Sequence, residues 1–125
     1  MDLQILGVFD KNTSRERLTL RVLEDCNCGD YIVMDTTYNE NGEKSNVWRH
    51  ALHLPNLKVC KGDQIKIYTR SGLQRTVKSK QGNNLHFVFW GLSGSIWNNS
   101  EDIAYLYKIS DSESKTIEND RMLKI

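Results

Sequence analysis

The stretch Ser95-Ile-Trp-Asn-Asn-Ser-Glu-Asp-Ile-Ala-Tyr-Leu-Tyr107 predicts a loop that leads directly into a half-buried strand. Asn and Asp adopt turn geometry readily and hydrogen-bond their own backbone, so the first half suits a loop. In the second half, Ile103, Tyr105 and Tyr107 fall on one face, while Ala104 and Leu106 fall on the other. This period of two indicates an all-β architecture.

Similar strand patterns recur on the N-terminal side of this stretch, separated by turn signals. The predicted strands cover residues 3–9, 17–23, 31–38, 47–54, 64–69, 85–90 and 103–109, with a short edge piece at Thr76-Val77. Turns are indicated by residues 26–30, by Asn41-Gly42 and by Ser71-Gly72. Two packed antiparallel sheets bury alternating faces most simply, so we expect a single β-sandwich domain over residues 1–125. Residues 110–125 are expected to form a final strand or a tail.

The composition limits the classes of partner. Lys and Arg number 17 against 16 Asp and Glu, which gives a formal net charge of +1. This balance does not suggest a dedicated nucleic-acid or anionic-membrane surface, although it leaves room for a local patch. Residues 1–5 lack the features of a signal peptide, and no stretch reaches the ~20 apolar residues that span a bilayer. We therefore expect a cytoplasmic protein with no membrane contact.

Three cysteines, Cys26, Cys28 and Cys60, raise the questions of metal binding and catalysis. A structural zinc ion needs four ligands, usually from two spaced pairs, and only scattered histidines accompany these thiols. No glycine-rich phosphate loop and no nucleophile signature occur, so no cofactor, metal, small-molecule substrate or catalytic residue is predicted. The competing enzyme hypothesis makes Cys60 or Cys28 a reactive thiolate beside a histidine.

A basic run between residues 66 and 80 is the one charge concentration that supports a binding hypothesis. Arg70, Arg75, Lys78 and Lys80 lie on or near a predicted hairpin, where they are able to contact phosphates. The alternative interpretation is a solvated strand edge whose charges prevent aggregation.

Four segments carry a resemblance to a known family: Leu54-Pro55, the run 59–68, Ile96-Trp97-Asn98-Asn99 with Asp102, Ala104 and Leu106, and the acidic strand entry over residues 16–21. In these segments the chain resembles the lamin-tail family, an immunoglobulin-like β-sandwich. The resemblance implies that Trp97, Asn98, Asn99 and Asp102 form a structural motif. It also implies a non-catalytic interaction module, acting in protein–protein contact or self-association. Nucleic-acid binding by the hairpin at residues 66–80 is the alternative, and a cysteine-dependent enzyme is a third hypothesis.

Overall fold

The computed structural model describes residues 1–36, 49–97 and 102–117, and within them the secondary structure is almost entirely β. The strands are β1 (Leu3–Phe9), β2 (Arg17–Val22), β3 (Cys26–Asn27), β4 (Tyr31–Thr36), β5 (His50–His53), β6 (Lys58–Val59), β7 (Gln64–Tyr68), β8 (Arg75–Lys78), β9 (Asn84–Phe89) and β10 (Ile103–Lys108). One 3₁₀ turn, η1 (Cys28–Asp30), separates β3 from β4.

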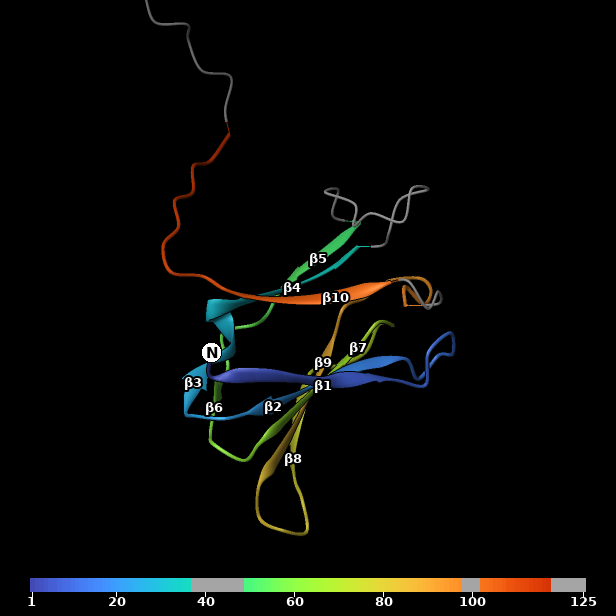
Figure 1. Ribbon diagram of the computed structural model, residues 1–125, viewed down its shortest axis with the longest axis vertical. Coiled ribbons are helices and arrows are strands. Elements are labelled where there is room, and N and C mark those ends of the chain that lie inside the picture. The colour runs from blue at the N-terminus through green and yellow to red at the C-terminus, as the bar shows by residue number, and fades with distance from the viewer. Residues whose placement is uncertain (37–48, 98–101, 118–125) are drawn as a thin grey trace, which may run out of the picture.

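The strands form two main sheets and a small ribbon (Figure 1). The five-stranded sheet has the order β1-β2-β7-β9-β8, the three-stranded sheet has the order β10-β4-β5, and β3 pairs with β6. The two main sheets pack against each other as a β-sandwich, which confirms the predicted fold class. The described residues contain no helix with the length and apolar character needed to cross a bilayer.

The core follows from strand alternation. Leu18, Leu20 and Val22 of β2 and Ile65 and Ile67 of β7 are each at most 1% exposed. From the three-stranded sheet and the loops, the core receives Tyr31, Val33, Leu54, Ile96 and Trp97. A period of two in residues 17–23 and 64–69 predicts the inward positions of β2 and β7, because it places every second side chain on one face of a strand. The burial of the five residues of β2 and β7 confirms that prediction.

A β-bulge in β1 reverses which side chains face the core. Leu3 and Ile5 pack inward, and uninterrupted alternation would turn Phe9 inward as well. The pairing with β2 shifts between Ile5 and Gly7, where Gly7 adopts a φ of +156°. Leu6 is the extra residue, since Ile5 pairs with Leu20 and Gly7 with Thr19. After it, Val8 packs against the core and Phe9 is 45% exposed.

Four expectations are corrected, narrowed to one alternative or left outside the described residues. The five-stranded sheet is mixed rather than antiparallel, because β8 lies at its edge and β9 returns between β8 and β7, parallel to β7. The predicted loop at residues 26–30 contains β3 and η1. Of the two alternatives for residues 110–125, residues 110–117 form a tail and no strand, while residues 118–125 lie outside the described ranges. The Asn41-Gly42 turn also lies outside them.

Candidate functional site

The outer face of the five-stranded sheet, turned away from the three-stranded sheet, carries aromatic and basic side chains in rows. Strand register defines the first row, which crosses four strands. Phe9 pairs with Arg17, Arg17 with Tyr68, and Tyr68 with Phe89. Because paired residues lie side by side on one face, these four side chains form a line across the sheet.

Two further rows run beside the first. Register places in the second row Thr19, Lys66, Phe87 and Arg75, and in the third row Arg21, Gln64, Leu85 and Val77. We call the surface made by Phe9, Arg17, Lys66, Tyr68, Arg70, Arg75, Phe87 and Phe89 the aromatic–arginine face.

Tyr68 is the centre of this face. Its ring stacks with Phe89 at a centroid distance of 5.4 Å and an interplanar angle of 19°, and with Phe87 at 6.2 Å and 21°. The guanidinium carbons of Arg70 and Arg17 lie 5.3 Å and 5.8 Å from the Tyr68 centroid. Arginines over ring faces are held by cation–π attraction, which orders the cations on the surface.

The remaining rings are also covered by arginines. Arg75 lies 4.5 Å from the Phe87 centroid, and Arg17 lies 5.7 Å from that of Phe9. The three rows contain four basic residues, Arg17, Arg21, Lys66 and Arg75, and no Asp or Glu. Asp10, in the turn after β1, is a nearby acid and pairs with Arg17 at 2.7 Å. The face is therefore electropositive.

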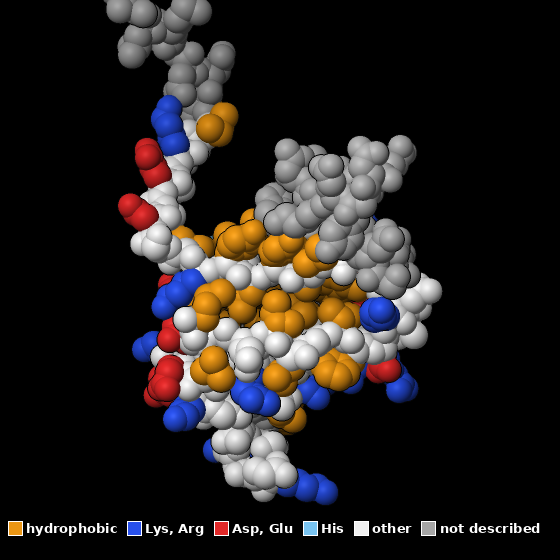
Figure 2. Space-filling view, in the orientation of Figure 1, with side chains coloured by type: hydrophobic (Ala, Val, Ile, Leu, Met, Phe, Trp, Pro, Cys, Tyr) orange, Lys and Arg blue, Asp and Glu red, His pale blue; other side chains and the backbone are white. Residues whose placement is uncertain are grey.

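The face is open on the side of β1. Leu6, Phe9, Arg17, Thr19, Gln64 and Lys66 line a shallow hollow of about 210 Å³. Figure 2 shows hydrophobic side chains in bands along β1 and β10, with Lys and Arg side chains around and below them.

The four residues predicted to contact nucleic acid do not lie on one surface of the protein. Arg70 and Arg75 lie on the aromatic–arginine face. Lys78 shares the opposite side of β8 with Thr76, whose hydroxyl hydrogen-bonds the buried His86, and Lys80 lies in the turn beyond the strand. The basic hairpin is therefore not one surface. Sequence reasoning missed the aromatic residues, because residues 85–90 are apolar on both faces apart from His86 and predict a central strand. That pattern does not reveal that Phe87 and Phe89 face outward.

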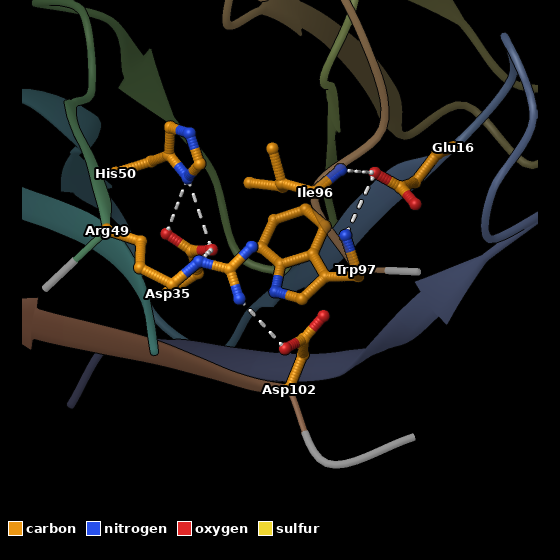
Figure 3. Close-up of polar contacts among 7 residues, drawn as sticks. All are labelled: Glu16, Asp35, Arg49, His50, Ile96, Trp97 and Asp102. Atoms are coloured by element: carbon orange, nitrogen blue, oxygen red, sulfur yellow. Dashed lines mark hydrogen bonds and ion pairs between the residues drawn. The ribbon is translucent and has the colours of Figure 1, made fainter. Parts of the chain in front are cut away.

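The predicted structural motif is anchored by a buried carboxylate, as Figure 3 shows. Glu16 is 0% exposed, and its Oε1 accepts hydrogen bonds from the backbone N–H groups of Ile96 (2.8 Å) and Trp97 (3.4 Å). Its Oε2 accepts a third bond from the Asn12 N–H. Trp97 is 2% exposed, while Asn98 and Asn99 lie outside the described residues. The acidic strand entry therefore fixes the loop that begins the motif.

A second buried carboxylate orients a histidine in the same region (Figure 3). Asp35 is 0% exposed and lies 3.0 Å from Nδ1 of His50, which is its cross-strand partner. Arg49 pairs with Asp102 at 3.2 Å. An Asp–His pair orients a general base, but catalysis by a nucleophile also needs a hydroxyl or thiol bonded to the imidazole. None of the described Ser, Thr or Cys side chains bonds His50.

A third polar group joins Asp63, His86 and Thr76. Oδ2 of Asp63 lies 2.9 Å from Nε2 of His86, and Nδ1 of His86 lies 2.9 Å from the Thr76 hydroxyl. Asp63 also accepts bonds from the backbone N–H groups of Cys60 and Asn84. Burial alone raises the pKa of Asp63, but these hydrogen bonds outweigh it and hold that pKa below its ordinary value. His86 is 4% exposed. Through these hydrogen bonds the group links Thr76 of β8 and His86 of β9 to the turn at residues 60–63, which precedes β7.

The thiols differ in accessibility. Cys28 is fully buried, and burial raises its pKa to about 12. Burial also raises the pKa of the partly buried Cys26, whereas Cys60 is exposed. Reactive thiols have lowered pKa values, so the environment of Cys28 is the opposite of an activating one. Among the described residues, no group of three or more His, Cys, Asp or Glu side chains is placed to hold a metal ion.

Comparison with protein-family models, curated proteins and solved structures finds no match for this chain. The resemblance to lamin-tail domains therefore stays a prediction, and the function must be argued from the surface itself.

Proposed function

We propose that the protein is a non-catalytic binding module that holds nucleic acid on its aromatic–arginine face. The observation that supports this most is the row Phe9–Arg17–Tyr68–Phe89, in which Arg17 lies between the Phe9 and Tyr68 rings. Arg70, beyond the end of β7, lies over the rings of Tyr68 and Phe89. A cytoplasmic location and an immunoglobulin-like, lamin-tail type of sandwich are parts of the same proposal.

The charge on the face favours nucleic acid over a protein partner. Aromatic and Arg side chains are also enriched in protein interfaces, so the residue types alone do not decide. Four basic side chains in the three rows, with no carboxylate among them, suit a phosphate backbone better than a mixed protein surface. Guanidinium groups also bind phosphate oxygens in pairs, which a lysine ammonium does not.

Salt-dependent binding tests the proposal. A fluorescently labelled DNA of about twelve nucleotides, as a single strand and as a duplex, is titrated with protein at several salt concentrations. Contacts from Arg17, Lys66, Arg70 and Arg75 predict that log affinity falls against log salt with a slope of about −3 to −4. Loss of Arg17 and Arg75 together, by substitution with Ala, is expected to flatten the slope by about 1.4 to 1.8.

Two single substitutions serve as controls. Lys58→Ala removes a positive charge from the small ribbon, away from the face, and should leave affinity unchanged. Lys78→Ala removes a charge from the opposite side of β8 and should weaken binding less than Arg75→Ala. Absence of binding to either DNA at low salt contradicts the proposal. In that case, salt-insensitive concentration-dependent association of the protein itself would favour the self-association that the sequence suggests.

A further inference from the structure

We infer that the nucleic acid held by this face is single-stranded, and that its bases stack on the rings of Tyr68 and its neighbours. This inference rests on the proposed function and adds the class of nucleic acid. Its basis is the pair of nearly parallel stacks that Tyr68 makes with Phe89 and Phe87 at 19° and 21°. Phe9 adds a more exposed ring at the β1 end of the same row.

Aromatic platforms distinguish unpaired bases from paired ones. In a duplex the base faces are already stacked on one another, so a protein ring beside the helix reaches only sugar, phosphate and base edges. In a single strand the base faces are free, and stacking on aromatic side chains is the usual way in which such strands are held. A duplex would use the arginines of the face and leave the rings without a role.

The arginines that now cover the rings do not prevent stacking. Cation–π attraction at an exposed site contributes a factor of about two to five in an equilibrium constant. A base stacked on an aromatic ring contributes a factor of about five to one hundred. A base that displaces Arg70 from Tyr68 therefore gains more than it loses, and the released guanidinium is free to pair with the adjacent phosphate.

The segment after β7 covers one of the rings, so the aromatic residues of the face do not all play the same part. A Cβ atom on Gly72 would collide with the Phe89 ring, so the backbone of this segment lies directly against that ring. Phe89 therefore supports Tyr68 from one side. Tyr68, Phe87 and Phe9 remain as the surfaces on which bases stack.

Three DNA molecules of equal length test the inference. We use a single strand, the corresponding duplex, and an abasic single strand that keeps every phosphate but lacks bases, each of about twelve nucleotides. The wild-type protein should bind the single strand at least about tenfold more tightly than the duplex or the abasic strand. Tyr68→Ala should weaken binding of the normal single strand about five- to hundredfold, with an unchanged salt slope, and should leave binding of the abasic strand unchanged.

Tyr68→Phe is the matched control and should retain the affinity, because it keeps the ring and removes only the hydroxyl. Phe9→Ala is a second variant with little risk to folding, since its ring is 45% exposed. It should also weaken single-strand binding without changing the salt slope.

The outcomes separate the two proposals. Equal affinity for the single strand, the duplex and the abasic strand would overturn the inference and leave the proposed function intact. Equal loss of affinity for normal and abasic strands in Tyr68→Ala would also overturn the inference. Lack of binding to all three DNA molecules would overturn both.

Discussion

Asp63 shows how one carboxylate can link stability to pH. Its side chain accepts bonds from the backbone N–H groups of Cys60 and Asn84 and from the His86 ring. Its pKa in the folded protein is lower than the ordinary value of about 4 that applies when the chain is unfolded. The ionised form is therefore favoured by folding. This stabilisation is fully present above the unfolded pKa and is lost as the pH falls through the folded pKa.

Asp63→Asn is the substitution that tests this link. Removal of the charge should lower the free energy of unfolding at pH 7 by about 1–3 kcal/mol, because hydrogen bonds to a charged acceptor are lost. It should also make the loss of stability below about pH 5 shallower than in the wild type. Urea unfolding measured from pH 7 down to pH 3 gives both quantities.

Two comparisons make the acid result specific. The exposed Asp30 serves as the control, and Asp30→Asn should keep the wild-type acid profile. Some pH dependence should remain in Asp63→Asn, since hydrogen bonds from Lys108 and Tyr31 lower the pKa of Asp2 as well. An acid profile for Asp63→Asn identical to that of the wild type would show that Asp63 is not responsible.

Within the strands, the bulge in β1 decides whether Phe9 belongs to the core or to the aromatic–arginine face. Gly7 has a φ of +156°, a conformation that residues with a Cβ atom rarely adopt. Gly7→Ala therefore strains the bulge and is expected to destabilise the protein by about 1–3 kcal/mol. If the bulge shifts, Phe9 also leaves its place beside Arg17, and single-strand affinity should fall. Urea unfolding and DNA titration measure the two effects.

Gly94 provides the matched control for Gly7. A Cβ atom there would meet nothing within 4 Å, and Gly94 is not among the glycines with positive φ. Gly94→Ala should leave both stability and binding close to wild type. Equal behaviour of the two Ala variants would show that the bulge tolerates a side chain.

The sequence predicts individual strands better than it predicts how they meet. Alternation correctly identified the inward faces of β2 and β7, because it depends only on neighbours two residues apart. The bulge at Gly7 was missed, since a glycine in a strand does not reveal whether an extra residue is accommodated there. The parallel pairing of β7 with β9 depends on where β8 comes to lie, which no local pattern records.

The same limit explains which candidate residues were found. Arg70 and Arg75 were identified because basic residues are concentrated between residues 66 and 80 of the sequence. The row Phe9–Arg17–Tyr68–Phe89 brings together four strands, and it exists only once their register is known. At the scale of the whole molecule, the aromatic–arginine face is thus a product of topology rather than of any motif.

Cys28 offers a measurement of how the whole sandwich opens. Its thiol is 0% exposed and belongs to the core cluster, and its backbone N–H bonds to the carbonyl of Leu57. A labelling reagent therefore reaches it only when the surrounding structure opens, and its pKa of about 12 disfavours the reactive thiolate until then. For a domain with a free energy of unfolding of ~5 kcal/mol or more, Cys28 should label at least about a thousandfold more slowly than Cys60.

The comparison uses variants that each retain one cysteine, with Ser at the other two positions. Urea that lowers the unfolding free energy should accelerate Cys28 labelling in proportion, while the exposed Cys60 should respond little. Labelling of Cys28 that is fast and insensitive to urea would show that η1 opens separately from the sandwich.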